Sequence, residues 1–255
     1  MTSSSLLSEF DLPAFELHNA KGSGNVVLIC DHASHRVPIQ LGTLGLTIDQ
    51  LTEHIGWDPG AAEVALQLSA LLDAPLLMSG YSRLVIDCNR PLQNAESIAV
   101  ESAGIAVPGN LTLTGEDRAR RIESLFKPYH HAIEELLDGR IDRPTVVLSI
   151  HSFSPSLNGQ SRPWHIGISA RYNIRLAQLM IAELSRNTSL KIGDNQPYAI
   201  EDEFDYSLPA HAESRGLPAV MIEIRQDGLS TATDISGWAS RLAASYQQIE
   251  SEVLN

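Results

Sequence analysis

The sequence predicts an α/β fold in which a mostly parallel sheet is covered on both faces. Apolar runs rich in β-branched residues alternate along the chain with amphipathic helical patterns. These runs are continuously apolar, which is typical of strands buried on both faces. The chain has 255 residues, of which 43% are hydrophobic, enough to build a sizeable core. No linker rich in Pro, Gly or Ser divides it, so we expect a single domain over residues 1–255.

The first half of the chain supplies three expected strands and one expected helix. Residues 25–30 form a continuous apolar run, and residues 61–73 follow with an apolar stripe at helical spacing. Two short strands are expected at 75–79 and 83–88, on either side of the turn-like Gly80.

The second half continues the alternation. A helix should run from Thr114, as its N-cap, to about Asp138, with a kink at Pro128. Further strands are expected at 145–150 and 218–224, and further helices at 174–184 and 235–253.

Charge and composition exclude several classes of protein. The chain carries 18 Lys and Arg against 31 Asp and Glu, a formal net charge of −13, which argues against nucleic acid or anionic lipid as a partner. No apolar run approaches the roughly 20 residues that cross a bilayer, and the N-terminus lacks the pattern of a secretory signal. The two cysteines, Cys30 and Cys88, cannot form a disulfide framework and suit a reducing cytoplasm.

Ligands of open α/β sheets bind beyond the carboxyl ends of the strands, so the polar residues there are candidate site residues. His32 and His35 follow the first strand and could supply two nitrogens to one metal ion. Asp58 could be a metal ligand, or the N-cap of a helix that has Pro59 in its first position. His54 could be a ligand, a partner of one, or an exposed residue.

Two arginines lie near the end of the expected strand 83–88. Asn89 and Arg90 directly follow it, and a guanidinium suits two-point contact with a carboxylate. Arg83 is a second cation nearby. The competing interpretation is a structural ion pair between Asp87 and an arginine.

Two later strands carry ionisable residues. His151 ends the strand 145–150, where it could be a rigid ligand or a buried structural residue. Glu223 lies within the apolar strand 218–224, which is costly for a carboxylate unless it is paired or neutral. It is therefore either a tuned acid/base or the partner of Arg225, which lies on the same face of the strand.

Four segments in order resemble the N-formylglutamate amidohydrolase family. They are Cys30-Asp-His-Ala-Ser-His-Arg-Val-Pro38, Gly56-Trp-Asp58, Ser82-Arg-Leu-Val-Ile-Asp-Cys-Asn-Arg-Pro91 and Ile150-His-Ser-Phe-Ser-Pro155. A more distant similarity, to zinc carboxypeptidases, runs through His32, Asp87-Cys-Asn89-Arg90, His151 and Glu223-Ile-Arg225, although residue 35 is His where those enzymes have Glu. The resemblance implies a phosphorylase/hydrolase-like three-layer α/β/α sandwich around a mixed, mostly parallel sheet.

The resemblance also implies a metal-dependent amide hydrolase that cleaves an N-acyl amino acid such as N-formyl-L-glutamate, as in histidine degradation. Zn²⁺ would be held by His32, His151 and one of His35, His54 or Asp58, and Glu223 would be the general base. Asn89 and Arg90 would hold the α-carboxylate of the substrate, and Arg83 or Arg162 a second carboxylate. His165 is a further candidate for lining the pocket.

Two other functions remain open at this point. Cys30 or Cys88, paired with a histidine, could be the nucleophile of a cysteine-dependent amidase. The chain could also be a non-catalytic binder of acidic metabolites, because a fold does not determine a function.

Overall fold

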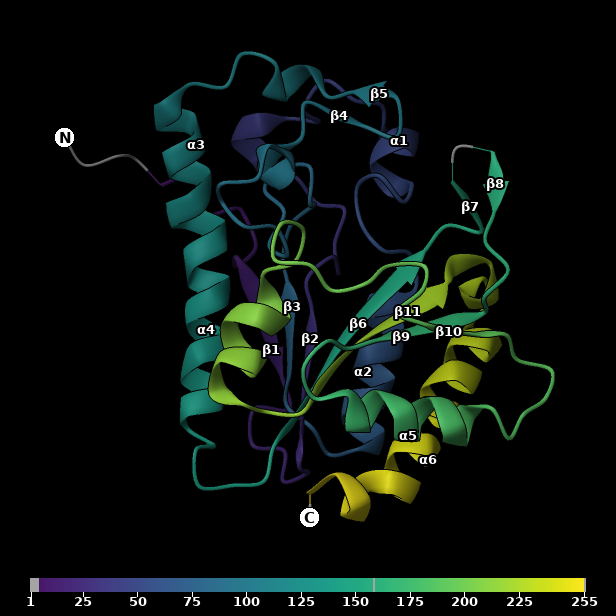
Figure 1. Cartoon of the computed structure of the whole chain (residues 1–255). Coiled ribbons are helices and arrows are strands. Elements are labelled where there is room, and N and C mark those ends of the chain that lie inside the picture. The colour runs from purple at the N-terminus through teal and green to yellow at the C-terminus, as the bar shows by residue number, and fades with distance from the viewer. Residues whose placement is uncertain (1–4, 158, 255) are drawn as a thin grey trace.

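The computed structural model describes residues 5–157 and 159–254, and its centre is a seven-stranded sheet (Figure 1). The strand order is β1-β3-β2-β6-β11-β9-β10. The central strands β3, β2, β6 and β11 are parallel to one another, whereas β1 pairs antiparallel with β3, and β9 pairs antiparallel with β11 and parallel with β10. The bounds are β1 Phe15–His18, β2 Val26–Cys30, β3 Leu76–Ser79, β6 Val146–Phe153, β9 Ile166–Ser169, β10 Ile192–Asp194 and β11 Ala219–Arg225.

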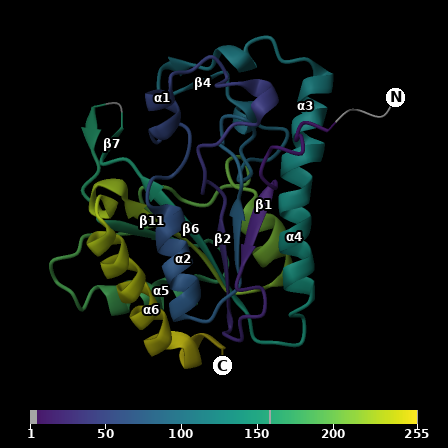
Figure 2. The same cartoon turned by 180° about the vertical axis from the view of Figure 1, so that it is seen from behind.

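Helices cover both faces of this sheet, which confirms the predicted α/β/α architecture. On one face lie α2 (Ala61–Leu71), α5 (Ile174–Leu184) and α6 (Ala232–Leu254), packed on alternate side chains of the central strands (Figures 1 and 2). On the other lie α4 (Lys127–Asp138) and the π-helical turn Leu208–Ala212, packed on the intervening side chains. The central strands are mostly apolar because each side chain faces one of these two layers.

The long helix over the second face is continuous from α3 (Gly115–Arg121) through a π-helical segment (Ile122–Phe126) into α4. Thr114 caps it as predicted, and its side chain accepts a hydrogen bond from the backbone N–H of Asp117. The π-helical segment ends two residues before Pro128, which has no N–H to continue the regular ladder.

A smaller layer lies beyond the end of the sheet to which β6 and β11 point. It contains α1 (Ile48–Thr52) and the two-stranded ribbon of β4 (Glu101–Ser102) and β5 (Ile105–Ala106), seen at the top of Figure 1. A second ribbon, β7 (Ser156–Leu157) and β8 (Gln160–Ser161), follows β6. Short 3-10 helices cover Ile39–Leu41, Ala95–Ile98, Pro108–Asn110, Glu213–Arg215 and Gln226–Leu229. Among the described residues, no helix has the length and apolar character that a membrane span requires.

One expected strand is wrong. Residues 83–88 form turns instead, with hydrogen bonds such as Val85 N–H to Ser82 O (2.9 Å). Leu84, Val85 and Ile86 are apolar because they pack in a separate cluster above the sheet. The edge strands β1 and β10 and the inner strand β9 are short, and the sequence analysis did not predict them.

Candidate metal centre and its pocket

Three buried side chains meet above the carboxyl ends of β2 and β6. His32 follows β2 and His151 lies in β6. Asp58 lies in the loop before α2, and its own backbone N–H donates a hydrogen bond to the backbone oxygen of His32 (2.9 Å). One potential ligand atom from each residue lies within 4.8 Å of the other two. The Oδ2 atom of Asp58 is 2.9 Å from His151 Nδ1 and 3.4 Å from His32 Nδ1.

Carboxylates hold the far nitrogen of each histidine. His32 Nε2 is 2.7 Å from Asp87 Oδ1, and His151 Nε2 is 3.3 Å from Asp31 Oδ2 and 3.0 Å from Ser149 Oγ. These contacts leave the Nδ1 atom of each ring directed toward Asp58. Metal-binding histidines in proteins are commonly held in this way, by a carboxylate on the other ring nitrogen.

The donor set fits a divalent metal ion. The Nδ1 atom of His32 is buried and has no hydrogen-bond partner in the described part of the chain. Burial, together with the charge of Arg83, lowers the pKa of His32 to about 4, so the ring is neutral at pH 7 and keeps a free lone pair. Two imidazole nitrogens and one carboxylate are a ligand set typical of zinc sites that keep a position open.

Asp58 therefore completes the group, and its carboxylate does not cap α2, which begins at Ala61 behind Gly60. His35 lies outside the group, where its ring packs edge-on against Trp57 with the centroids 4.9 Å apart. His54 lies nearer, with Nδ1 3.7 Å from Asp58 Oδ1. Burial and the neighbouring Arg83 lower the pKa of His54 to about 2, which keeps this ring neutral.

Glu223 lies beside the group on the neighbouring strand. It pairs in register with His151, since β11 runs parallel to β6. Both residues line a cavity of about 350 Å³ together with His32 and Asp58. Burial raises the pKa of the Glu223 carboxyl, and its Oε2 atom has no hydrogen-bond partner among the described residues. Arg225 pairs with Asp227 instead, at 2.7 Å.

Arg83 and Arg90 bring positive charge to the same cavity. Arg83 donates to Asp58 Oδ1, and Arg90 donates to the backbone oxygen of Phe204 and lies over its ring, 5.8 Å from the centroid. Asn89 lines the cavity too, but its amide is engaged by a neighbouring loop. Its Nδ2 donates to Asp205 (3.0 Å), and its Oδ1 accepts from the backbone N–H groups of residues 206 and 207.

The other two expected pocket residues lie farther out. Arg162 is buried and donates to the hydroxyl of Tyr198 (2.8 Å), which lines the cavity, and its own Nη1 is buried without a hydrogen-bond partner. His165 lies elsewhere, in a small depression with Arg225 and Trp238, where its Nδ1 accepts a hydrogen bond from the backbone of Lys191 (2.9 Å).

Asp31 is a residue of the site that the sequence analysis missed. Besides His151, its carboxylate contacts the hydroxyls of Tyr129 (3.0 Å) and Ser207 (2.5 Å). Burial would raise its pKa, but the contacts with His151 and Ser207 lower it to about 2, so Asp31 stays ionised. The signal was present in the sequence, because Asp31 directly follows an apolar strand and precedes a candidate ligand.

Neither thiol resembles a nucleophile. Cys30 and Cys88 are buried and free, and burial raises the pKa of both. Neither residue is among those that line the cavity.

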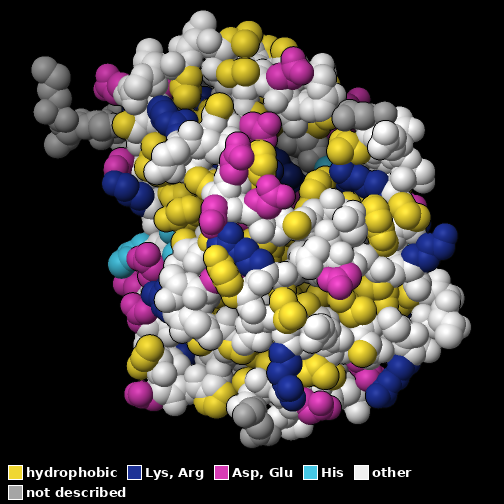
Figure 3. Space-filling view, in the orientation of Figure 1, with side chains coloured by type: hydrophobic (Ala, Val, Ile, Leu, Met, Phe, Trp, Pro, Cys, Tyr) yellow, Lys and Arg dark blue, Asp and Glu magenta, His cyan; other side chains and the backbone are white. Residues whose placement is uncertain are grey.

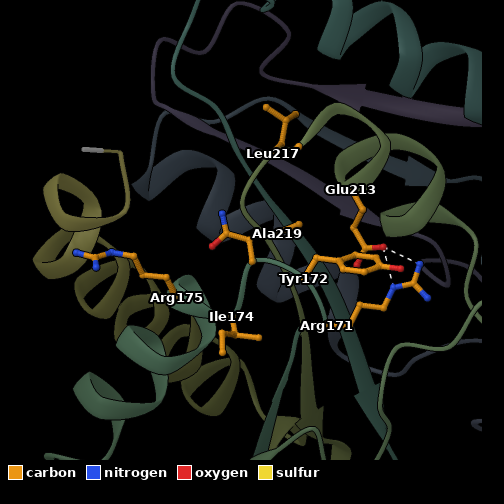
Figure 4. Close-up of a pocket in the computed structure, with 9 residues that line it drawn as sticks. Arg171, Tyr172, Ile174, Arg175, Glu213, Leu217 and Ala219 are labelled. Carbon is orange, nitrogen blue, oxygen red and sulfur yellow. Dashed lines mark hydrogen bonds and ion pairs between the residues drawn. The ribbon is translucent and has the colours of Figure 1, made fainter.

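Another cavity, of about 440 Å³, lies at the opposite end of the sheet, by the start of β11 (Figure 4). Its acid, Glu213, forms an ion pair with Arg171 (2.8 Å), which also contacts Asp202. Arg171 lies over the ring of Tyr172, with its guanidinium carbon 4.8 Å from the centroid. The acid of this cavity is thus paired with an arginine, whereas the Oε2 atom of Glu223 has no hydrogen-bond partner among the described residues.

Comparisons with known proteins agree with this picture. Residues 24–230 match the family model for N-formylglutamate amidohydrolase. A gene product of Agrobacterium tumefaciens, known from its crystal structure, is 37% identical with a TM-score of 0.94, over 98% of this chain and 100% of that one. An N-formylglutamate amidohydrolase from Ralstonia eutropha JMP134 shares the fold at 18% identity, with a TM-score of 0.70, over 95% of this chain and 98% of that one.

A search of the curated proteins finds no match. The family match spans every residue of the metal group and its pocket, from His32 to Glu223. The chain therefore belongs to the N-formylglutamate amidohydrolase family, and it is a hydrolase that acts on amide bonds.

Proposed function

We propose that this protein is a zinc-dependent hydrolase of N-acyl amino acids, which converts N-formyl-L-glutamate to formate and glutamate. The observation that carries the proposal is the buried group of His32, Asp58 and His151 with the Glu223 carboxylate in the same cavity. We further propose the reducing cytoplasm as its location, since both cysteines are buried free thiols.

In this proposal Glu223 moves the proton. His32, Asp58 and His151 would hold a zinc ion, which would supply Lewis-acid activation of water near neutral pH. Glu223 accepts the proton of the attacking water and passes it to the nitrogen of the leaving amine. The buried, unpartnered Oε2 atom supports this role, because a structural carboxylate at such a depth would normally be hydrogen-bonded.

Arg90 and Arg83 recognise the acidic part of the substrate. A protein of net charge −13 repels a dianion at long range, so the local field in the pocket has to be positive. Arg90 lines the cavity and carries the two-point donor that a carboxylate prefers. Arg83 lines the same cavity and donates to Asp58, and Arg162 donates to the hydroxyl of Tyr198, which also lines the cavity. Asn89 positions the loop at Asp205 that closes this side of the cavity.

The test is release of glutamate from N-formyl-L-glutamate by zinc-loaded protein, beside a sample stripped with a chelator and a stripped sample given zinc again. We expect turnover in the first and third samples and none in the second. Equal turnover in all three would contradict the metal-dependent reaction. Binding of N-formyl-L-glutamate by the zinc-loaded protein without any turnover would instead identify a non-catalytic binder.

A further inference from the structure

A second cavity, here named the outer groove, continues from the pocket that holds Glu223. The two cavities share four lining residues, His54, Arg83, Arg90 and Tyr198, so a ligand can occupy both at once. The inner cavity measures about 350 Å³ and the outer groove about 1050 Å³. Sites for small molecules typically span about 300–1,000 Å³. The inner cavity alone is therefore sufficient for a compound as small as N-formyl-L-glutamate, which leaves the outer groove unused.

The walls of the outer groove suit a polar chain. They come from the loop after α1, the β4–β5 ribbon and the start of the β7–β8 ribbon, and many of their side chains are uncharged and polar: Thr52, Ser102, Ser154, Ser156 and Gln226. The Oε1 atom of Gln226 is buried and accepts no hydrogen bond from any described residue. A buried acceptor without a partner costs free energy, which a donor on a bound ligand would recover.

The outer groove has acidic residues of its own. Its arginines, Arg83 and Arg90, also line the inner cavity, whereas its acidic residues line the outer groove alone: Glu53, Asp87, Glu96 and Glu101. Glu96 lies 4.0 Å from Arg90, but Glu53 and Glu101 form no ion pair within the described part of the chain. Figure 3 shows one face of the molecule, on which Asp and Glu side chains lie beside a hollow with Lys or Arg in its depth.

The acidic residues of the outer groove indicate which part of a substrate enters it. The carboxylates of the amino acid have their partners at the junction and farther in, and they would be repelled by Glu53 and Glu101. The acyl group lies on the other side of the scissile amide, and it is the part of the substrate to which no binding residues have been assigned. A formyl group is too small to reach the outer groove at all.

We propose that the outer groove binds the acyl part of a second, longer kind of N-acyl amino acid, whose acyl part is a chain of several atoms with a positive charge at its far end. The inference rests on the proposed function, since it assumes hydrolysis of an N-acyl amino acid. In that reaction the amide C–N bond breaks, the oxygen of water joins the acyl carbon, and the amine leaves with a proton.

The experiment compares three substrates of zinc-loaded protein: N-formyl-, N-heptanoyl- and N-(6-aminohexanoyl)-L-glutamate. The last two have the same length and differ only in a terminal methyl or ammonium group. We expect kcat/KM for the aminohexanoyl compound to exceed that for the heptanoyl compound about fivefold, from two exposed charge pairs. The double variant Glu53→Gln/Glu101→Gln should lose this preference. The matched control Glu9→Gln/Glu252→Gln removes the same charge from exposed positions outside the groove and should keep it.

The outcomes separate this inference from the proposed function. Turnover of the formyl compound alone, or a preference that survives in Glu53→Gln/Glu101→Gln, would overturn the role of the outer groove and leave the hydrolase intact. Failure of all three substrates to turn over would overturn the proposed function. In that case calorimetric titration of the two long compounds tests the role of the outer groove independently of turnover. Tighter binding of the ammonium compound supports this role, and equal binding of the two compounds refutes it.

Discussion

The carboxylate of Asp87 accepts a hydrogen bond of 2.7 Å from His32 Nε2, across 55 positions of the sequence. The same Oδ1 atom accepts the backbone N–H of Asn89 (2.8 Å). One short segment thus orients a candidate metal ligand and also presents Arg90 to the substrate cavity. Under the proposed function, Asp87 would couple metal binding to substrate recognition.

Asp87→Asn should weaken zinc binding about 10- to 100-fold, because the neutral amide no longer holds the His32 ring by a charged contact. Competition against a chromophoric chelator measures the change. Asp142→Asn, at an exposed position, is the control and should bind zinc like the wild type. An unchanged zinc Kd in Asp87→Asn would remove Asp87 from the site.

Glu223→Gln should lower kcat by a factor of about 10² or more, as loss of a general base does, and leave the zinc content unchanged. The glutamine keeps the shape of the side chain but cannot accept the proton of water. Steady-state kinetics together with metal analysis provide the measurement. Turnover within twofold of the wild type would show that another group moves the proton.

Arg90→Lys should raise KM for N-formyl-L-glutamate about tenfold with a smaller effect on kcat, because lysine cannot reproduce a planar two-point contact with a carboxylate. Arg186→Lys, on the surface beside Glu183, is the matched control. If KM is the same in both variants, Arg90 does not hold the substrate.

Alkylation of thiols in the folded protein should leave activity unchanged, whereas chelation abolishes it. The relative exposures of Cys30 and Cys88 are 0% and 5%, and burial raises the pKa of each thiol, so little thiolate meets the reagent. The assay follows activity and the mass of the protein in parallel. Inactivation that tracks modification of one cysteine would favour the cysteine-dependent amidase.

A buried histidine pair behind the site should make the fold sensitive to acid. His130 donates to Cys88 O from Nε2 (2.9 Å) and accepts from His211 Nε2 at Nδ1 (2.9 Å). Burial lowers the pKa of His130 to about 3 and that of His211 to about 4, below the usual 6.5. Between pH 6.5 and 4 the unfolded chain therefore binds more protons than the folded one, and stability falls as the pH falls.

His211→Gln should flatten this dependence, because one of the two titrating groups is gone. In denaturant titrations at pH 6.5, 5.5 and 4.5, we expect the free energy of unfolding to fall less steeply by up to about 1.4 kcal/mol per pH unit. His131→Gln, at an exposed neighbouring position, should follow the wild type. Parallel slopes in all three proteins would contradict the assignment of acid sensitivity to the pair.

Local patterns were sufficient to predict the elements that bury a continuous face. The helix expected at 174–184 has those bounds in the structure. The strand expected at 145–150 is β6, which begins one residue later, at Val146, and continues three residues further, to Phe153. The run 83–88 was wrongly predicted as a strand because an apolar run that is buried among loops has the same pattern as a buried strand. Whether such a run packs in a sheet or among loops depends on its neighbours in three dimensions, which the sequence does not show. The strands β1, β9 and β10 are too short to show a periodic pattern of hydrophobic residues.

The site was predictable to the extent that its residues follow strands. His32, Asp58, His151 and Glu223 all appeared as candidates, and the structure brings them together. The choice between Asp58, His54 and His35 required three-dimensional distances, since their spacing along the chain does not say which of them lies beside His32 and His151. Asp31, Tyr129 and Ser207 come from three separate parts of the chain, so no local motif joins them.

The residues proposed to react and the residues at the mouth of the cavities lie on different kinds of element. Glu223 and His151 pair across the neighbouring strands β11 and β6. Both residues belong to central strands, the part of a sheet whose amide hydrogens exchange most slowly. Tyr198, Phe204 and Glu101, by contrast, lie on loops and a short ribbon at the mouth of the cavities. Changes in these outer segments can accumulate during evolution and alter which molecules are accepted, while the reacting groups keep their positions.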